Sequence, residues 1–418
     1  MTNNKIVIPV PRSENYGEWT FKAILFLLWP FGAFLYSLRD AASKSSYVIY
    51  FLFGVLFCWH MNPTGVERFD DLIGIMKRVI ESNYSWSDIG EQIISYFSFS
   101  DDGAKELYEN FLICLSKTFT PNPHLFFALA SIPYLVFMLK SLKQITTDEK
   151  FDSSIYGLLI LALFVMPRDI ITVQNPRFTT AVWIVVYATI KFYQQKSYSL
   201  KYFAFIVVTP LIHSAFWFYV LVFIGGLVLR RFPSITIWLL YLSVPFSYMS
   251  YDILSGLDYS FMPSSIRVWT EGYLDEDHYN AYVAHTGASG FYWVQQVASI
   301  YRNTVYLIIP LFLWRIKDKP AVKRFGDLFR YYIYFFAVVN FIQVVPVLGE
   351  RFMWIVQILS LYLFFKIIYP KHKILLWLLI SSWVYFAFRR YFYGGALSSS
   401  VPLEIFYMPA PTLIADFW

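Results

Sequence analysis

Long apolar runs alternate with short polar gaps along most of the chain. Many of the runs approach the length of about 20 residues that an α-helix needs to cross a bilayer. Lipid offers no partners to backbone polar groups, so spanning segments of this kind are helical. The pattern predicts an all-α, polytopic transmembrane fold. It has about 11 to 12 membrane segments, because there are eleven apolar runs and one of them is long enough for two segments. The apolar runs cover residues 20–38, 47–62, 124–142, 154–168, 178–193, 202–229, 235–251, 291–314, 329–348, 352–369 and 374–393.

The run 202–229 is too long for one straight span. It has 28 residues, with Pro210 and His213 near its middle. We predict a broken helix pair or re-entrant hairpin that bends near Pro210–Ser214; one tilted and kinked helix is the alternative. Irregular backbone at membrane depth is tolerated only where protein buries it or water reaches it.

The long polar gaps differ in charge from the short ones. Loop 63–123 has ten acidic and five basic residues, and loop 252–290 has six acidic residues and one basic residue. Loop 315–330 has six basic and two acidic residues. Because Lys and Arg gather in cytoplasmic loops, the basic loop should be cytoplasmic and the two acidic loops external. Counting spans from the external loop 63–123 and from the cytoplasmic loop 315–330 places both flanks of 202–229 on the cytoplasmic side. This result favours the hairpin.

Both external loops have features of amphipathic helices. In the first loop, Leu107, Phe111, Leu112, Leu115 and Phe119 recur at helical spacing, which indicates a helix lying on the membrane face. The second loop contains the stretch DEDHYNAYVAH, which we interpret as a lid over the external face. The chain 1–418 is thus expected to form a single integral membrane domain.

Composition supports this interpretation. Of the 418 residues, 57% are hydrophobic and 15% are charged, whereas charged residues approach a quarter of a soluble domain. The net charge of +6 reflects cytoplasmic loops rather than nucleic-acid binding. Neither of the two cysteines belongs to a metal-ligand spacing, and the N-terminus lacks the pattern of a signal peptide.

The stretch FVMPRDIITVQNPRFTTAVW concentrates polar groups between two apolar runs. Arg168 and Arg177 bracket it, and a guanidinium can donate two parallel hydrogen bonds to a phosphate. Charged groups close to hydrocarbon usually face a partner or a cavity. The two arginines therefore indicate a diphosphate site. As an alternative, Arg168 pairs with Asp169 or extends to lipid headgroups.

Two further candidates lie at other breaks between apolar runs. Arg351 follows Gly349 and Glu350, and a second arginine here would complete a diphosphate clamp; a charge pair that caps two connected helices is the alternative. His213 lies at the expected bend of 202–229, where it could donate to a leaving phosphate or move a proton. A structural role in packing is its alternative.

Carboxylates supply candidate bases. Asp70 and Asp71 follow the second apolar run, and Glu109 opens the later helix of the same loop. Each could accept a proton or bind a divalent cation, and each could equally be a solvated residue in the first turn of an external helix. The chain has no HExxH, P-loop or nucleophile-elbow motif.

The order of these features resembles the Wzy-type bacterial polysaccharide polymerases, in particular the EpsG-like branch. The resemblance covers nearly the whole chain. It departs at the carboxylates, because the branch often has Gly-Asp at the first site and Glu-Pro-Gly before the third span, where this chain has FDD and YENF. It rests on GVERFDDLIGIM, YENFLICLSKTFTPNPHLFF, QNPRFTTAVW, LIHSAFW, DEDHYNAY and GERFMW.

The resemblance implies a reaction at the outer face of the bacterial cytoplasmic membrane. A glycan on polyprenyl diphosphate would be transferred to a sugar hydroxyl of another lipid-linked repeat unit. The implied partners are this glycan donor and acceptor and membrane lipids, with a chain-length regulator and a flippase as further candidates and no nucleic acid. No cofactor and no metal are expected. The implied roles are catalytic for Asp70, Asp71, Glu109 and His213, diphosphate-binding for Arg168, Arg177 and Arg351, and substrate-lid for His285, Tyr282 and Arg267.

Three other functions remain open. A flippase for lipid-linked oligosaccharides needs a central cavity and often shows two related halves, and this chain shows no internal repeat. Another polyprenyl-phosphate-dependent glycosyltransferase would use Asp70 and Asp71 with a divalent ion. A membrane O-acyltransferase is the third alternative.

Overall fold

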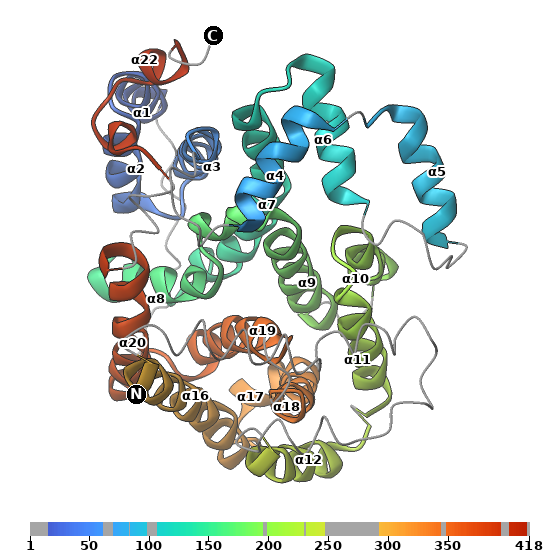
Figure 1. Cartoon of the computed structure of the whole chain (residues 1–418). Coiled ribbons are helices and arrows are strands. Elements are labelled where there is room, and N and C mark those ends of the chain that lie inside the picture. The colour runs from blue at the N-terminus through green and yellow to red at the C-terminus, as the bar shows by residue number, and fades with distance from the viewer. Residues whose placement is uncertain are drawn as a thin grey trace. The chain divides into compact units, whose positions relative to one another are not determined.

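The computed structural model describes residues 16–61, 70–82, 84–97, 107–194, 199–229, 231–246, 292–343, 348–393 and 401–415. All regular structure in these ranges is helical, and they contain no strand (Figure 1). Four helical segments are long and apolar enough to cross a membrane, and four shorter apolar helices accompany them. The expected all-α, polytopic membrane fold is confirmed.

The chain divides into two compact units. Unit 1 comprises Met1–Asn83, Leu112–Trp183 and Arg389–Trp418, and unit 2 comprises Tyr84–Phe111 and Ile184–Phe388. Helices α6 (Tyr108–Phe119) and α9 (Pro176–Gln194) each contribute residues to both units. That the whole chain acts as one integral membrane domain stays a prediction.

Unit 1 is organised around an antiparallel helix pair, α3 and α7. Tyr47 of α3 bonds Thr146 of α7 at 2.5 Å, and at the opposite ends His124 Nδ1 lies 2.8 Å from the carbonyl oxygen of Trp59. The elements of unit 1 are α1 (Tyr16–Leu28), α2 (Pro30–Ser37), η1 (Leu38–Asp40), α3 (Lys44–Trp59), α4 (Asp70–Glu81), α7 (Pro123–Thr146), α8 (Ile155–Val165), η3 (Met166–Arg168), η4 (Ile170–Gln174), η6 (Arg389–Tyr393), η7 (Leu403–Phe406) and α22 (Ala410–Ala415), with parts of α6 and α9.

A buried lysine joins the N-terminal helices of unit 1. Lys22 of α1 donates to the hydroxyls of Ser43, Ser45 and Ser46 at 3.2, 2.8 and 3.0 Å. It also lies 3.4 Å from the carboxylate of Glu18. A buried cation is tolerated when it is paired and fully hydrogen-bonded, so these contacts fix α1 against the start of α3.

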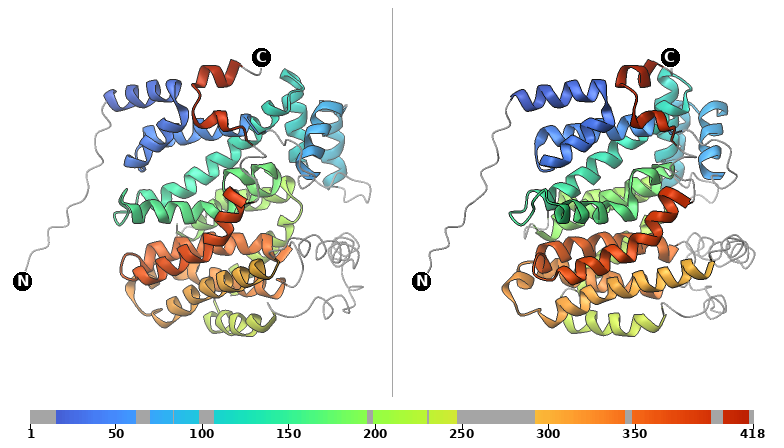
Figure 2. Two further views of the ribbon diagram at one scale, coloured as in Figure 1. Left: turned by 60° about the vertical axis from the view of Figure 1, so that its left-hand side comes forward. Right: turned by 90° about the vertical axis from the view of Figure 1, so that its left-hand side faces the viewer.

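Unit 2 contains most of the remaining apolar helices, which run side by side (Figure 2). Its elements are α5 (Trp86–Phe97), α10 (Leu200–Ile212), α11 (Phe216–Leu229), α12 (Pro233–Phe246), α16 (Tyr292–Arg315), α17 (Pro320–Arg324), α18 (Gly326–Phe341), α19 (Leu348–Leu363), η5 (Phe364–Ile368) and α20 (Lys373–Phe388), with parts of α6 and α9.

The apolar runs predicted the helices well, with one break missed. The run 20–38 is two helices, because Pro30 lacks an N–H and begins α2 directly after Trp29. The amphipathic helices expected in 63–123 are confirmed as α4 and α6 within the described residues, and α5 between them was not predicted. At the start of α5, the amide and hydroxyl of Ser85 both donate to the carboxylate of Asp88, at 2.8 and 2.9 Å, so this side chain binds an N–H that the helix leaves without an intrahelical partner.

The run 202–229 is a helical hairpin, as expected. Helix α10 ends at Ile212 and α11 begins at Phe216, so His213, Ser214 and Ala215 form the corner. Phe203 and Phe223, each ten residues from His213, pair with ring centroids 6.3 Å apart. Equal spacing on both sides of the corner shows that α11 returns along α10.

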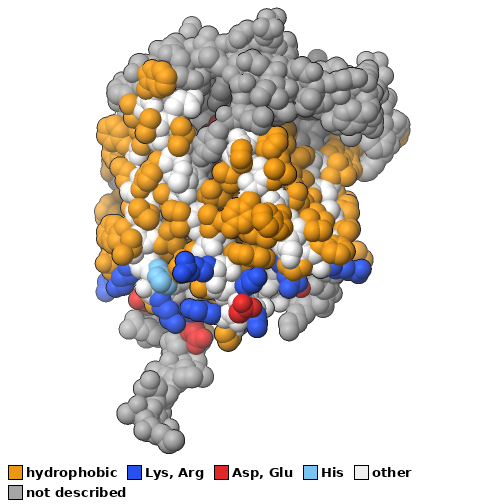
Figure 3. All heavy atoms as spheres, turned by 90° about the horizontal axis from the view of Figure 1, so that it is seen from below, with side chains coloured by type: hydrophobic (Ala, Val, Ile, Leu, Met, Phe, Trp, Pro, Cys, Tyr) orange, Lys and Arg blue, Asp and Glu red, His pale blue; other side chains and the backbone are white. Residues whose placement is uncertain are grey.

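Exposed basic residues mark one end of unit 2. Helices α11 and α16 end there and α18 and α20 begin there. Figure 3 shows Lys and Arg side chains in a band along the edge of an apolar face. We call this set the basic rim; it consists of Arg231, Arg315, Lys317, Lys319, Lys323, Arg324, Lys371 and Lys373.

Candidate functional site

The corner of the α10–α11 hairpin lies at the end of unit 2 away from the basic rim. Helix α11 runs antiparallel to α18, since Tyr219 packs on Phe335 and Phe223 packs on Tyr331, nearer the start of α18. The start of α18 directly follows the rim residues of α17. Helix α11 has 14 residues, or about 21 Å at 1.5 Å per residue, so the corner is that far from the rim.

His213 is buried at this corner, with 6% of its surface exposed. Its backbone N–H donates to the carbonyl of Thr209 at 3.0 Å, and the N–H of Ala215 donates to its ring Nδ1 at 3.2 Å. A ring nitrogen that accepts a hydrogen bond carries no proton, so the neutral imidazole has its proton on Nε2. His213 therefore presents a donor on the side of the ring away from the corner backbone.

The start of α6 packs against the same corner. The N–H of Leu107 donates to the carbonyl of Leu211 at 3.2 Å, which joins the residue before α6 to the last turn of α10. Glu109 lies two residues after Leu107 and is 4% exposed. Its carboxylate in the first turn of a helix is favoured by the helix dipole. The hydrogen bond thus brings the segments of Glu109 and His213 together.

The start of α19 reaches the corner from a third part of the chain. Phe352, next to Arg351, packs on Phe216 and Phe218 of α11 with ring centroids 5.6 and 4.9 Å apart. His213 in turn lies 6.2 Å from Phe216. Arg351 therefore belongs to the same end of unit 2 as Glu109 and His213, although the three are far apart in sequence.

Gly349 holds the first turn of α19 in place. A Cβ added at Gly349 would lie 2.4 Å from Gln343 Cα and 2.5 Å from the Ile342 carbonyl oxygen. Only glycine allows the end of α18 and the start of α19 to approach this closely. This close approach at the start of α19 helps to fix the position of Arg351.

In unit 1, the stretch around Arg168 is buried 3₁₀ chain rather than an open loop. Residues Pro167, Arg168 and Asp169 are buried. The carbonyl of Arg168 accepts from Trp183 Nε1 at 2.9 Å and from the Tyr134 hydroxyl at 3.4 Å. The Arg168 guanidinium lies over the ring of Phe178, 4.8 Å from its centroid. Arg168 is therefore held inside unit 1 by backbone and ring contacts.

Asp169 is bound by the C-terminal part of the chain. Arg390 Nη1 donates to its Oδ2 at 3.0 Å and to the Met166 carbonyl at 2.9 Å, and the Tyr391 hydroxyl also donates to Oδ2. The carboxylate next to Arg168 is thus already committed to Arg390. One alternative from the sequence was an ion pair between Arg168 and Asp169. In the structure, Asp169 forms its ion pair with Arg390.

Arg177 is the second residue of α9 and is half-buried. Asn175 caps the helix, since its Oδ1 accepts from the Phe178 N–H at 3.3 Å, and Pro176 occupies the first helical position. Thr179 adds a hydrogen bond to the Thr172 carbonyl at 2.8 Å, which ties α9 to the 3₁₀ stretch. The position of Arg177 is therefore fixed by where α9 starts.

The other predicted residues are only partly described. Asp70 and Asp71 form the start of α4, and their side chains are outside the described atoms. Arg267, Tyr282 and His285 lie outside the described residues. Arg177 and Arg351 belong to different units, so their convergence on one diphosphate stays a prediction.

Sequence reasoning missed two arginines. Arg390 and its role at Asp169 had no local signal, because the partners are 221 positions apart. Arg302 lies in the middle of α16 and is 4% exposed, with its guanidinium 3.8 Å from the ring centroid of Phe386 and 5.1 Å from that of Trp383. A charge inside a long apolar run was the signal that could have found Arg302.

A model of the EpsG family matches residues 80–404, well over half of the 418-residue chain. No curated protein and no solved structure matches the sequence. The matched range contains Glu109, Arg168, Arg177, His213 and Arg351.

Proposed function

Because the chain belongs to the EpsG family, which indicates a polysaccharide polymerase, we propose that it joins lipid-linked repeat units into a polysaccharide. The glycan donor would be carried on polyprenyl diphosphate and the acceptor would be a sugar hydroxyl of a second lipid-linked unit. The observation that carries the proposal is the meeting of the Glu109, His213 and Arg351 segments at one end of unit 2.

The proposed reaction exchanges one bond for another at the anomeric carbon of the donor. The bond to the diphosphate oxygen breaks and a bond to the acceptor hydroxyl oxygen forms. The proton of that hydroxyl passes to a base, and polyprenyl diphosphate leaves with the bonding electrons. A site for this reaction needs an acceptor for the proton and fixed positive charge for the leaving group.

The arginines supply the positive charge. Arg177 and Arg351 both lie in the first turn of a helix, where the helix dipole favours an anion. A cation at this position is disfavoured by the dipole unless an anion is also present. In our proposal, the guanidinium of each arginine binds a diphosphate oxygen, and Arg168 adds charge within unit 1.

Glu109 and His213 complete the proposed chemistry. Glu109 would accept the proton of the attacking hydroxyl. His213, with its proton on Nε2, would donate a hydrogen bond to the departing diphosphate. Asp70 and Asp71 at the start of α4 remain alternative bases.

The basic rim supports an orientation for this site. Lys and Arg of membrane proteins gather on the cytoplasmic side. With the rim in the cytoplasm, the Glu109–His213–Arg351 end of unit 2 would face the outside of the bacterial cytoplasmic membrane. The hairpin helices have 13 and 14 residues, or about 20 Å each, less than the roughly 30 Å hydrocarbon core, so the corner would lie below the outer surface.

Purified full-length protein with lipid-linked repeat units tests the proposal, with products resolved as a ladder on a gel. We expect a ladder from the native chain, none from Arg351→Ala, and the same ladder with chelator present. A ladder that chelator abolishes would favour the metal-dependent glycosyltransferase using Asp70 and Asp71. In a deletion strain, single repeat units should accumulate outside the membrane; their accumulation inside would support a flippase instead.

A further inference from the structure

Two turns of the basic rim come together between α16 and α20. The first turn follows α16 and the second precedes α20. The ring of His372 packs edge-on against Phe312, in the last part of α16, with centroids 4.9 Å apart. This contact joins the turns into one group, which we call the α16–α20 basic cluster; it consists of Arg315, Lys317, Lys319, Lys371, His372 and Lys373, all exposed.

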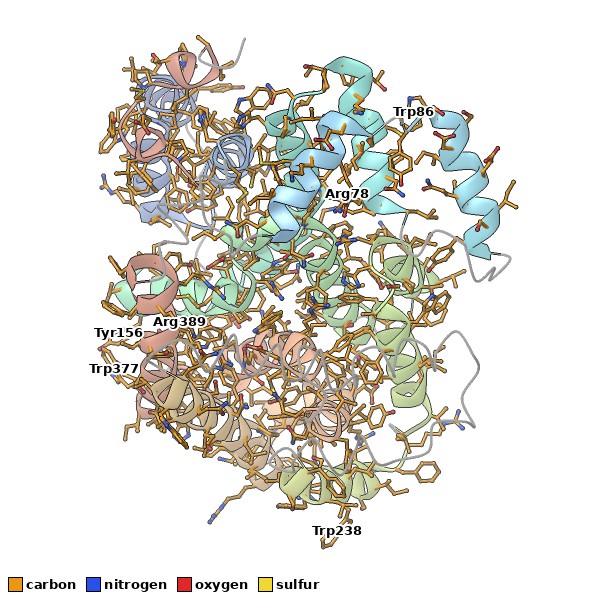
Figure 4. All side chains as sticks on the ribbon, in the orientation of Figure 1. Arg78, Trp86, Tyr156, Trp238, Trp377 and Arg389 are labelled. Carbon is orange, nitrogen blue, oxygen red and sulfur yellow. The ribbon has the colours of Figure 1, made fainter. Side chains whose placement is uncertain are left out.

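The cluster lies at the edge of a surface that suits lipid tails. Ile374 and Trp377, directly after the cluster in α20, are 79% and 52% exposed. Trp377 and, on α12, Trp238 point outward from the ribbon (Figure 4). Figure 3 shows a band of Lys and Arg side chains that borders an apolar face. Side chains at such a border reach the depth of lipid headgroups.

The charge of the cluster is strongly one-sided. Its two turns hold five permanent cations and one carboxylate, Asp318. Elsewhere near the rim, Arg330 has an acidic partner, Asp327, at 3.7 Å. Like charges in two joined turns repel one another, so the cluster is complementary to an anion.

Aromatic contacts restrain one member of each turn of the cluster. Lys317 Nζ lies 4.2 Å from the ring centroid of Trp314, and the His372–Phe312 contact fixes the other turn. A cation over a Trp face is attracted to the ring and loses part of its freedom. These contacts restrain one cation in the first turn and the ring between Lys371 and Lys373 in the second.

We propose that the α16–α20 basic cluster binds the phosphate headgroup of an anionic phospholipid. The acyl chains would lie along the exposed apolar residues of α20, and the headgroup phosphate would be bound by Lys317, Lys371 and Lys373. Basic sites between membrane helices bind anionic lipid headgroups by this chemistry. The proposal is independent of the polymerase function.

Native mass spectrometry of the full-length protein tests the site. The protein is released from mild detergent with equal amounts of phosphatidylglycerol and phosphatidylcholine of the same acyl chains. We expect phosphatidylglycerol adducts to persist, and the triple variant Lys317→Gln, Lys371→Gln and Lys373→Gln to weaken their apparent affinity at least tenfold. Phe312→Ala, which removes no charge, should also weaken it by separating the turns.

A matched control removes the same charge elsewhere. Lys140→Gln, Lys143→Gln and Lys150→Gln replace three exposed lysines of unit 1 and should leave phosphatidylglycerol retention unchanged. Equal loss in both triple variants would show diffuse attraction and overturn the proposal. Equal retention of the two lipids by the native chain would also overturn it.

Discussion

Arg390 donates a hydrogen bond to the carboxylate of Asp169 at 3.0 Å, across 221 positions of the chain. The Asp169 side chain is 6% exposed and that of Arg390 is 25% exposed. The carboxylate that directly follows Arg168 in the sequence is thus paired with Arg390. This pair therefore links the end of the chain to the segment that carries two proposed diphosphate ligands.

Arg390→Gln should destabilise unit 1 by about 3 kcal/mol, the low end for breaking a buried ion pair because Arg390 is partly exposed. The cause is an uncompensated Asp169 carboxylate. Adding Asp169→Asn removes that charge and should restore most of the lost stability. Thermal unfolding of all three variants in detergent measures the coupling. A double variant no more stable than Arg390→Gln would contradict this account, and Arg389→Gln serves as the neighbouring charge control.

Gly349→Ala should cost about 1–3 kcal/mol, the range for overpacking, because its new methyl group meets the backbone at Gln343. The first turn of α19 would have to shift, so polymer formation should fall as well. The control is Gly90→Ala in α5, where a Cβ meets nothing within 4 Å. That change should be neutral or stabilise by up to about 1 kcal/mol. Unfolding temperatures and gel ladders of both variants provide the comparison.

Arg177→Ala and Arg351→Ala should each abolish long-chain polymer while the protein still inserts and folds. Loss of one donor to developing charge typically lowers turnover by about 10²–10³-fold. Lysine at either position should rescue poorly, because an ammonium cannot donate two parallel bonds. Arg231→Ala, at the basic rim, is the control. Normal polymer in both site variants would remove these arginines from the mechanism.

His213→Ala should cause a large but incomplete loss of polymer, because the arginines still stabilise the leaving group. A matched control tests the hairpin itself: Tyr219→Phe removes a buried hydroxyl bonded to Thr189 at 2.7 Å. That variant should lose about 1 kcal/mol of stability and keep its activity. Polymer at the native level from His213→Ala would return this residue to a packing role.

Helix α5 should loosen in acid. Hydrogen bonds from the Ser85 amide and hydroxyl hold the pKa of Asp88 below its ordinary value of 3.8. Because the pKa of Asp88 is lower in the folded protein, the carboxylate stabilises the helix fully above its ordinary pKa. This contribution is lost as pH falls through the folded-state pKa. The protection factors of the α5 amides, which are corrected for the intrinsic pH dependence of hydrogen exchange, should therefore fall at low pH, and Asp88→Ala should remove this fall.

The sequence predicted the elements better than the contacts between them. Apolar runs and their polar gaps revealed the helices, because a lipid-embedded backbone has few alternatives. The hairpin at His213 was predictable, since charge counting and the length of 202–229 agreed. The Arg390–Asp169 bond and the Phe352–Phe216 packing were not, because no local pattern specifies which distant helix a side chain meets. The break at Trp29–Pro30 was missed although proline gave a signal, because the run stays apolar across it.

The hairpin of α10 and α11 also determines whether the number of membrane crossings before a later segment is odd or even. Its two halves run in opposite directions, so the pair adds no net passage between the two sides. Every segment after Arg231 therefore keeps the sidedness that it would have if the pair were absent. If α10 and α11 formed one continuous helix, the pair would cross the membrane once. The sidedness of every later segment would then be inverted.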